Sequence, residues 1–397
     1  MKRVDPDKVR TKTSPVGLEK GNVKIQRIYL DLEAQKDEMT ERILGRFSRV
    51  PVDRIEDRDA FLKKARTVSL AEGKKALWLT RFKGPLLKPC PATGEGYLCC
   101  RYWIINTQVN CPLDCTYCVL QSYLDQPFLT FYTNAADVCQ EIDRLLESEP
   151  KRLFRIGTGE LTDSLALDFL TGWNQDLIRF ASPRNFILEL KTKTDLIREL
   201  PVISKRNIVV SWSLNPPEVI RDEEFKTGAL EDRLRAASAI LSKGYRLGFH
   251  FDPLVEVPGW ETKYSQVIRR LTDEIPETEV LWISLGSLRF QPSLKKVIQK
   301  RFPHSRTASG ELVRGLDGKM RYFRPVRVQM YEKIYTQIRK SWKKVFVYFC
   351  MESSGVWKRI IGFSPENNAH LDYLFHESLN RRFPELRFCP PGRKNYR

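Results

Sequence analysis

The sequence predicts an α/β protein whose main body is a partial (β/α)6 TIM-like barrel, with an N-terminal α/β cap and a basic C-terminal region. Two observations predict this fold. From residue 102 onward, apolar runs of strand length alternate with segments of helical periodicity. Glycines, cysteines and charged residues recur where these runs end, and parallel barrels carry their functional groups there. A doubly wound parallel sheet shows the same alternation and remains the alternative.

Six apolar runs are expected to form the parallel strands, namely 102–107, 153–156, 185–190, 207–212, 246–251 and 280–285. The helices expected between and after them are 135–147, 164–179, 195–200, 230–242, 262–274 and 294–301. Strands that alternate with helices favour right-handed crossovers within one parallel sheet. Six such units are too few to close the usual eight-unit barrel, so we expect an open barrel.

A smaller α/β cap is expected before the barrel. Val23–Leu30 alternates like a strand, Gln35–Phe47 has helical spacing, and Ala76–Thr80 is a further short strand. The first 20 or so residues are polar and charged, so we expect them to be loose, and they lack the apolar core of a signal peptide. The expected domains are therefore a cap at 1–95, the barrel at 96–300 and a basic region at 301–397.

The composition favours a cytoplasmic protein. The chain is 42% hydrophobic and 29% charged, and it has no run of about 18 apolar residues that could span a membrane. Nine cysteines, an odd number, do not suggest a secreted disulfide framework. We expect a monomer with no membrane attachment.

The net charge of +18 is concentrated near the C-terminus. Between Gln291 and Arg397 there are 23 lysines and arginines against 8 acidic residues, a net charge of +15. Within this region, a Gly315–Gly318 turn precedes a stretch that interleaves cations with aromatic residues. This pattern predicts a hairpin that contacts nucleic acid through Arg321, Tyr322, Arg324 and Arg327. A solvated basic surface is the alternative.

The strongest chemical signal is the segment Asn110–Cys118, in which Cys111, Cys115 and Cys118 form a C-x3-C-x2-C pattern. Three thiolates on one loop can hold an iron–sulfur cluster and leave one iron open to a small molecule. A zinc site with Cys99 or Cys100 as fourth ligand is the less favoured alternative, because zinc ligands usually come as two C-x2-C pairs.

The other cysteines carry no signal of comparable strength. Cys139 and Cys350 are expected to pack as small apolar residues. The sequence assigns no role to Cys90, Cys99, Cys100 or Cys389.

Further candidate residues lie at the ends of later strands. Gly157–Glu160 reads Gly-Thr-Gly-Glu, in which glycines would let a ligand approach the backbone and the carboxylate would accept an amino group. A simple turn is the alternative. Lys191 is a candidate partner for a carboxylate, or else a solvated lysine, and Ser211 and Ser213 end the fourth strand. His250 ends the fifth strand and is more often a core histidine in such a position.

These motifs resemble those of the radical S-adenosylmethionine superfamily, and more narrowly those of the spore photoproduct lyase family. The narrower resemblance rests on Asn110–Gln121, Phe131–Asn134, Asp163–Asp168, Gly244–Phe249 and Gly259–Trp260. It covers the barrel and is patchy before residue 95 and after residue 329.

The resemblance implies a 4Fe-4S cluster on the three cysteines, with S-adenosylmethionine chelated by the open iron. Reductive cleavage would give a 5′-deoxyadenosyl radical, which in the lyase starts the repair of a thymine dimer by cleaving the methylene bridge between the bases. Implied partners are DNA and an electron donor such as flavodoxin or ferredoxin. The residues implied to contact the cofactors are Tyr117, Gly157, Gly159, Glu160, Thr162, Lys191, Ser211 and Ser213.

The sequence departs from the family at two positions. The segment Gly157–Glu160 lacks the hydrogen-donor cysteine that the family carries after its second strand, and Val119 replaces the tyrosine that follows the last cluster cysteine. Tyr117 and Cys139 are candidate substitutes, with Tyr117 as the candidate catalytic residue. The leading prediction is a radical enzyme that repairs a thymine dimer-type DNA lesion by C–C cleavage. A radical enzyme acting on RNA or a small molecule is the alternative, and a zinc-stabilised nucleic-acid-binding module is the third.

Overall fold

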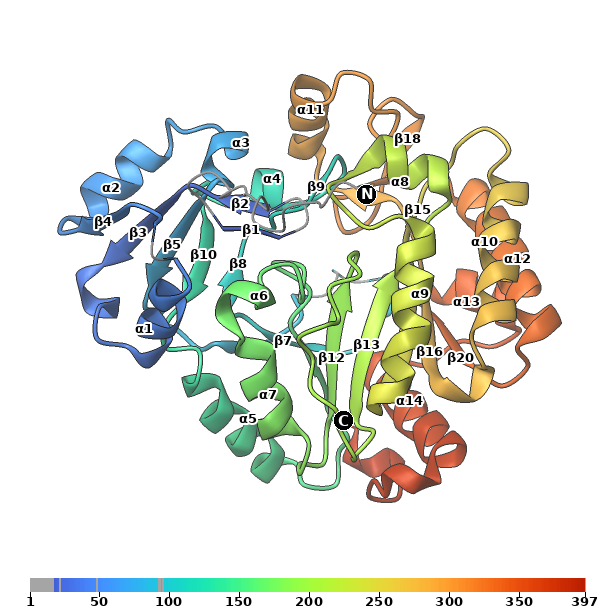
Figure 1. The fold of residues 1–397 in the computed structure, drawn as a ribbon. Coiled ribbons are helices and arrows are strands. Elements are labelled where there is room, and N and C mark those ends of the chain that lie inside the picture. Colours follow the sequence, from blue (N-terminus) through green and yellow to red (C-terminus); the bar gives the residue numbers. More distant parts are fainter. Residues whose placement is uncertain (1–17, 21–22, 48, 92–93, 95, 397) are drawn as a thin grey trace, which may run out of the picture.

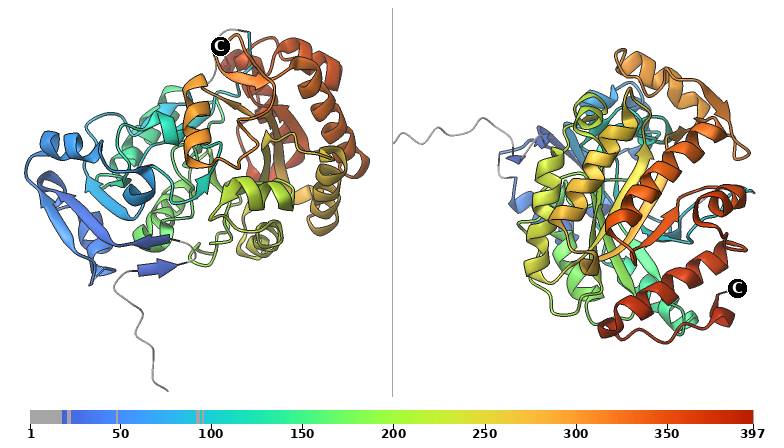
Figure 2. Two further views of the ribbon diagram at one scale, coloured as in Figure 1. Left: turned by 90° about the horizontal axis from the view of Figure 1, so that it is seen from above. Right: turned by 90° about the vertical axis from the view of Figure 1, so that its right-hand side faces the viewer.

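A computed structural model describes residues 18–20, 23–47, 49–91, 94 and 96–396, so the expectation of a loose N-terminus falls largely outside the described residues. The fold has a larger sheet and a smaller sheet side by side, each with its own helices (Figures 1 and 2). No helix among the described residues is long and apolar enough to cross a membrane.

The larger sheet contains all six predicted parallel strands. Its order is β20-β16-β15-β13-β12-β11-β7-β6. The predicted strands are β7 (Trp103–Ile105), β11 (Arg155–Gly157), β12 (Ile187–Thr192), β13 (Ile208–Ser213), β15 (Arg246–Leu254) and β16 (Val280–Ser287). A seventh parallel strand, β20 (Phe346–Phe349), pairs with β16, and β6 (Leu87–Pro89) pairs antiparallel with β7 at the other edge.

The helices of the barrel lie on the outer face of this curved sheet (Figure 1). A doubly wound sheet would carry helices on both faces, so the partial barrel is confirmed. The helices on the outer face are α5 (Asp137–Ser148), α6 (Asp168–Thr171), α7 (Trp173–Ala181), α9 (Leu230–Ile240), α10 (Trp260–Glu274), α12 (Arg324–Ser341), α13 (Ser354–Ile361) and α14 (Asn368–Arg382). Two further helices, α8 (Pro217–Glu223) and α11 (Pro292–Arg301), lie at the top of Figure 1.

Two expected helices differ in the structure. The segment 164–179 forms two helices, because Gly172 adopts a left-handed conformation (φ +63°) between α6 and α7. The segment 195–200 forms no helix. Pro201 disfavours a helical conformation at the residue before it, and the Lys243 ammonium satisfies three carbonyls of this segment, at Ile197, Arg198 and Leu200.

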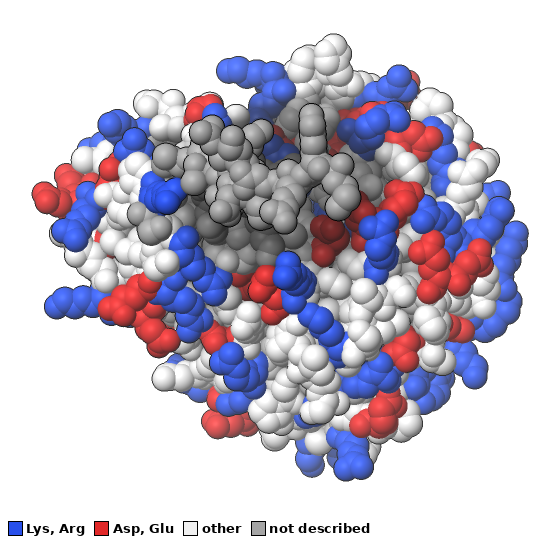
Figure 3. All heavy atoms as spheres, viewed as in Figure 1, with Lys and Arg blue, Asp and Glu red and all other residues white. Residues whose placement is uncertain are grey.

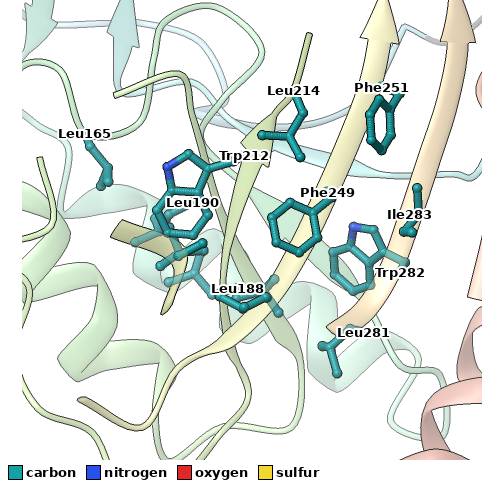
Figure 4. Packing of buried hydrophobic residues seen from close by; sticks show 14 of the residues in the cluster. Leu165, Leu188, Leu190, Trp212, Leu214, Phe249, Phe251, Leu281, Trp282 and Ile283 are labelled. Carbon is teal, nitrogen blue, oxygen red and sulfur yellow. The ribbon is translucent and has the colours of Figure 1, made fainter. Parts of the chain in front are cut away.

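Large apolar side chains fill the core around the barrel strands. Trp212, Phe249 and Trp282 are at most 1% exposed and pack with leucines of the neighbouring strands (Figure 4). A Cβ atom at Gly248 would lie 2.9 Å from Trp282 Nε1, so this strand requires glycine at its contact with the indole. Because the interior is filled, the functional groups gather at the carboxyl ends of the strands.

The smaller sheet has the order β4-β3-β5-β10-β8. Its strands are β3 (Arg27–Asp31), β4 (Val52–Ile55), β5 (Ala76–Thr80), β8 (Gln108–Val109) and β10 (Leu129–Tyr132), and its helices are α1 (Glu38–Gly45), α2 (Arg58–Ala65) and α3 (Leu70–Gly73). A short hairpin, β1 (Leu18–Lys20) with β2 (Val23–Ile25), precedes it.

The three predicted regions are interlocked rather than consecutive. The strands β8 and β10 lie beyond residue 95 and complete the smaller sheet, whereas β20 lies beyond residue 300 and completes the larger one. The cysteine segment is the connection between β8 and β10. It therefore joins two strands of the smaller sheet and carries β9 (Asp114–Cys115) between them.

Candidate functional site

The cysteine segment is held on both sides by pairing with distant parts of the chain. Within it, β9 (Asp114–Cys115) pairs antiparallel with β14 (Glu224–Phe225). Asn110 adopts a left-handed conformation (φ 70°), accepts the Cys111 N–H on its side-chain oxygen and donates its amide to the Pro127 carbonyl at 2.8 Å. These contacts fix the backbone that carries the three thiols.

Cys115 is buried, Cys111 and Cys118 are partly buried, and the three thiols are close enough to affect one another electrostatically. Burial raises the pKa of Cys111 to about 12 and raises those of Cys115 and Cys118, while Lys74 opposes the shift at Cys111 and Cys118. Among the described residues, no three His, Cys, Asp or Glu side chains are placed to hold a metal ion. A cluster held by these thiols would replace the thiol protons and compensate the thiolate charge.

The zinc alternative requires a fourth ligand. Cys99 and Cys100 are the expected candidates, and the Cys99 thiol is hydrogen-bonded with Cys90 and Cys100. The zinc site stays an alternative prediction.

The side chain of Tyr117 is buried in a network that the sequence did not predict. Its hydroxyl donates to the Glu224 carboxylate, and Lys193 Nζ lies 3.2 Å from the hydroxyl oxygen and 2.8 Å from Glu224 Oε1. Arg233 donates to Glu224 Oε2 at 2.6 Å. The pKa of Tyr117 is raised far above its usual value, mainly by burial and next by the negative charge of Glu224. This phenol is therefore protonated and committed to Glu224.

Lys191 pairs with Glu160, as the sequence suggested for a lysine at this strand end. Lys191 Nζ lies 2.5 Å from Glu160 Oε1, and the two side chains are 23% and 34% exposed. Burial would lower the pKa of Lys191, but Glu160 and Glu189 outweigh it and raise the pKa. Lys191 is thus an ammonium, and the ion pair is partly exposed at the edge where the strands end.

The two glycines of Gly157–Glu160 are required by packing within the chain. A Cβ atom at Gly157 would lie 1.7 Å from the Tyr102 hydroxyl oxygen, and one at Gly159 would lie 2.5 Å from Lys191 Cβ. Tyr102 and Lys191 therefore lie against these glycines, and the approach of a ligand to their backbone stays a prediction. Glycine here allows Lys191 to approach the segment that carries Glu160.

The remaining expected cofactor contacts are buried near the same strand ends. Thr162 donates to the Asp163 carbonyl at 3.4 Å, and Ser213 is 6% exposed at the end of β13. Ser211 is fully buried and donates to Glu189 Oε1 at 2.6 Å. The hydroxyl of Ser211 is therefore already used within the protein.

Glu189 and His250 form a second buried pair in the barrel. His250 Nε2 lies 2.8 Å from Glu189 Oε1. Burial opposes ionisation of Glu189, but His250 and Lys191 lower its pKa to about 2. His250 is therefore a polar partner rather than a simple core residue. Glu189 was not predicted from the sequence. It lies two residues before Lys191 in β12, and this spacing places both side chains on the same face of the strand.

Four cysteines form a second thiol group, defined by Cys90, Cys99, Cys100 and Cys350. The Cys90 N–H donates to the Tyr102 carbonyl at 2.7 Å, and the Leu98 N–H donates to the Glu352 carbonyl at 2.9 Å, which brings these segments together. The hydrogen bond from Cys99, with Arg155, lowers the pKa of Cys100 to about 6.

Cys350, Cys139 and Cys389 can be compared with what the sequence predicted for them. Cys350 Sγ accepts a contact from Arg289 Nη2 at 3.3 Å, so it is not the simple apolar residue expected. Cys139 lies apart in α5, and burial raises its pKa to about 11. Cys389 Sγ lies 3.8 Å from Asn185 Nδ2.

The basic hairpin exists, but most of its expected contact residues face inward. The strands β18 (Leu312–Arg314) and β19 (Met320–Tyr322) form the hairpin. Arg321 is 1% exposed and pairs with Asp317 at 2.6 Å, and buried Arg327 pairs with Glu352 at 2.7 Å.

The expectation that Arg321, Tyr322 and Arg327 contact nucleic acid is therefore wrong for this structure, because all three are buried and both arginines are neutralised. Arg324 is exposed, next to Phe323, which is 58% exposed. On the face shown in Figure 3, cationic and acidic side chains are interspersed and form no single continuous patch.

Comparisons with known proteins place these features in context. A family model described as spore photoproduct lyase matches residues 100–349. The spore photoproduct lyase of Clostridium acetobutylicum is 26% identical over 200 residues, which cover 50% of this chain and 59% of the relative. The spore photoproduct lyase of Bacillus subtilis is 26% identical over 210 residues, which cover 51% of this chain and 61% of that relative. The match thus spans about three fifths of these relatives.

Solved structures show the same fold. A spore photoproduct lyase complexed with dinucleoside spore photoproduct aligns with a TM-score of 0.73 at 20% identity, covering 83% of this chain and 99% of that one. A double mutant of the lyase with bound AdoMet and dinucleoside spore photoproduct aligns with a TM-score of 0.72 at 20% identity. The alignment covers 82% of this chain and 98% of that one.

Proposed function

Because this chain belongs to the spore photoproduct lyase family, we propose that it is a radical S-adenosylmethionine enzyme that repairs a thymine dimer-type lesion in DNA by C–C bond cleavage. The observation that carries the proposal is the arrangement of a buried three-thiol segment with the charged Glu160–Lys191 pair at the carboxyl ends of the strands. The three thiols offer ligands for a metal cluster, and the pair offers charges for an amino acid group.

Cys111, Cys115 and Cys118 would hold a 4Fe-4S cluster. Lys74 at Cys111 and Cys118, and Lys193 at Cys115 and Cys118, favour the thiolate forms that ligate a cluster, and they oppose the effect of burial. Lys74 also fixes the segment, since its Nζ donates to the Leu113 carbonyl at 2.6 Å and to Asp114 Oδ1 at 3.0 Å. When bound, the cluster and S-adenosylmethionine supply the 5′-deoxyadenosyl radical that starts the reaction.

Glu160 and Lys191 would bind the methionine end of S-adenosylmethionine. An amino acid carries one ammonium and one carboxylate, and the pair presents one carboxylate and one ammonium at 2.5 Å. Glu160 would accept the amino group and Lys191 would donate to the carboxylate. Gly159 supports this arrangement, because any larger residue would displace Lys191.

A thiol is still available to end the reaction, although Gly157–Glu160 contains none. Cys139 lies in the outer helix α5, and the Tyr117 hydroxyl is committed to Glu224. By contrast, Cys100 is close enough to Glu189 in the barrel for their charges to interact. The Cys99 side chain is hydrogen-bonded to Cys100. We therefore assign the hydrogen-donor role to Cys99, whose raised pKa keeps its S–H while Cys100 carries the thiolate; Cys99 would give its hydrogen atom to the substrate-derived radical and be left as a thiyl radical.

The proposed partners are DNA and an electron donor such as flavodoxin or ferredoxin. The positive charge of residues 291–397 would attract the phosphates, and exposed Arg324 is the candidate contact in the hairpin. A lesion base within a duplex would have to leave the stack to reach the strand ends. We propose that the chain acts as a cytoplasmic monomer.

One observation favours a second candidate, a radical enzyme that acts on RNA or a small molecule. The usual donor cysteine is absent from Gly157–Glu160, and Val119, which is 43% exposed, cannot relay a radical as a tyrosine can. The deciding experiment incubates anaerobically reconstituted protein with dinucleoside spore photoproduct, S-adenosylmethionine and dithionite. Thymidine release supports the lesion-repair function, whereas 5′-deoxyadenosine without thymidine supports a different substrate.

A further inference from the structure

A groove of about 660 Å³ lies between the helices α12, α13 and α14 and the first residues of β20. Its volume falls within the usual range of about 300–1,000 Å³ for small-molecule sites. Thr278 and Val345, which line it, precede β16 and β20, so the groove lies at the amino ends of these strands. Lys191 and Glu160 lie at the carboxyl ends of the sheet. The groove is therefore a separate site from the one described above.

The side chains around this groove carry a large excess of positive charge. One carboxylate, that of Glu277, faces five cations, and its Oε1 accepts the backbone N–H of Val345 at 2.6 Å. None of the five cations forms an ion pair with a carboxylate among the residues that the structure describes. The five cations are Arg339, Lys343, Lys344, Arg381 and Arg382.

Arg382 shows the effect of this crowding. Its guanidinium donates to backbone carbonyls, at 3.0 Å to Val280 and at 3.0 Å to Leu281, rather than to a carboxylate. Burial, with Arg339 and Arg381 nearby, lowers the pKa of Arg382 to about 10, against the opposing effect of Glu277. An anion bound in the groove would offset this repulsion.

The floor of the groove is apolar and aromatic. Phe363 is 41% exposed, and Phe346 and Ile361 are partly exposed beside it. Tyr335 also lines the groove, with the Arg339 guanidinium 4.9 Å from its ring centroid. Aromatic rings beneath a cationic rim match a flat base that carries a phosphate.

We propose that this groove binds a nucleoside phosphate, with the base against Phe346 and Phe363 and the phosphate among Lys343, Lys344 and Arg381. The phosphate group would meet cations that have no acidic partner in the described structure, and the base would cover the exposed aromatic floor. The nucleotide could be free or the end of a nucleic-acid strand, and both present the same chemistry. The site does not depend on the proposed radical reaction.

The test is a calorimetric titration of the full chain at low salt with adenosine 5′-monophosphate, adenosine, inorganic phosphate and a short single-stranded oligonucleotide. We expect the nucleotide to bind at least about tenfold more tightly than adenosine or phosphate, because both halves of the groove contribute. Tighter binding of the oligonucleotide that is weakened by Lys343→Glu/Arg381→Glu would identify a strand end as the source, and tighter binding of the mononucleotide would identify a free nucleotide.

The double variant Lys343→Glu/Arg381→Glu should weaken nucleotide binding at least about tenfold. The matched control Lys296→Glu/Lys300→Glu makes the same charge change at exposed lysines of α11, outside the groove, and should bind like the parent chain. Phe363→Ala tests the aromatic floor without a charge change, and circular dichroism confirms that each variant is folded. Binding that is unaffected by both the double variant and Phe363→Ala, or no tighter than that of phosphate, would overturn the proposal. Because binding at Glu160 and Lys191 would not respond to these variants, the result is independent of the radical activity.

Discussion

Lys191 Nζ and Glu160 Oε1 lie 2.5 Å apart across the carboxyl ends of two neighbouring strands. This pair is the link between the barrel and the cofactor chemistry that we propose, because its two charges complement the two charges of an amino acid. Both side chains remain partly exposed although the strands that carry them are buried. The following predictions test this arrangement and the features around it.

Lys191→Ala should weaken S-adenosylmethionine binding by about 10- to 100-fold, since a hydrogen bond to a charged group contributes about 1.5–3 kcal/mol. Glu160→Gln should have a smaller effect, because the amide oxygen still accepts a hydrogen bond. Equilibrium binding to the reconstituted protein measures both effects. Lys205→Ala, which removes a partly buried lysine bonded to the Arg184 carbonyl, is the control. Equal affinities for the parent chain and Lys191→Ala would contradict the assignment.

Cys115→Ala should abolish the cluster while the chain remains folded. Reconstituted parent protein should contain about four iron and four sulfide per chain and should absorb visible light. Cys139→Ala removes a thiol of α5 far from the cysteine segment and should retain full iron content. Zinc in place of iron, or iron retained after Cys115→Ala, would exclude the proposed cluster.

Cys100 should be the most acidic thiol of the second group, and its alkylation should show this. Its pKa of about 6 means that the reactive thiolate forms as the pH rises through 6, whereas the thiol of Cys139, with a pKa of about 11, stays protonated to high pH. Mass spectrometry of apoprotein alkylated with iodoacetamide at pH 5 to 9 measures both rates. Cys99→Ala should shift the Cys100 profile to higher pH, because the Cys99 hydrogen bond is the largest cause of the lowered pKa. A Cys100 profile that parallels that of Cys139 would refute the assignment.

Two arginines close together in sequence should respond oppositely to substitution. Arg324→Glu should weaken DNA binding and reduce its salt dependence, with little change in melting temperature, because Arg324 is exposed. Arg321→Ala should instead destabilise the fold by about 1–3 kcal/mol, because it removes the buried Arg321–Asp317 ion pair and leaves Asp317 with the Lys319 ammonium at 3.2 Å. Fluorescence anisotropy against salt concentration and thermal unfolding distinguish the two. A loss of DNA affinity in Arg321→Ala at unchanged stability would show that the hairpin binds phosphates after all.

The sequence predicted the parts of the site that depend on one strand or on neighbouring strands. The alternation of Glu189 and Lys191 in β12 places both on one face, and the parallel order β11-β12 brings Glu160 beside Lys191. Periodicity and strand order are local properties, so the barrel and this pair were predictable. The exception was 195–200, where Pro201 and Lys243 outweigh helical spacing.

The residues that sequence reasoning missed meet through contacts between distant segments. Glu224 contacts Tyr117, 107 residues earlier in the sequence, because β14 pairs with β9. Cys350 joins the other thiols through the contact between Leu98 and Glu352. Such pairings leave no periodic trace in the sequence.

The cations of the hairpin illustrate a different difficulty. A stretch of alternating cations and aromatics has the same pattern whether its arginines face solvent or buried carboxylates. The partner of Arg327, Glu352, lies 25 residues away in sequence, and burial of the pair depends on tertiary packing.

The role assigned to the thiols predicts a specific kinetic phenotype. The Cys99→Ala/Cys100→Ala variant should still form 5′-deoxyadenosine, because the cofactor contacts are intact, but should lose most of its thymidine product. Deuterium from solvent-exchanged thiols should appear in the thymidine that the parent chain releases. Unchanged thymidine yield in the variant would exclude both cysteines as donors, and Cys139→Ala is again the matched control.

The measurement that tests the central proposal most directly is the product analysis of one anaerobic reaction. Reconstituted protein, S-adenosylmethionine, dithionite and dinucleoside spore photoproduct are incubated, and thymidine and 5′-deoxyadenosine are quantified by chromatography. The account predicts that both products accumulate in the parent chain and that neither forms in Cys115→Ala. Formation of 5′-deoxyadenosine without thymidine would contradict the proposed lesion repair, and absence of both from iron-loaded parent protein would contradict the radical chemistry itself.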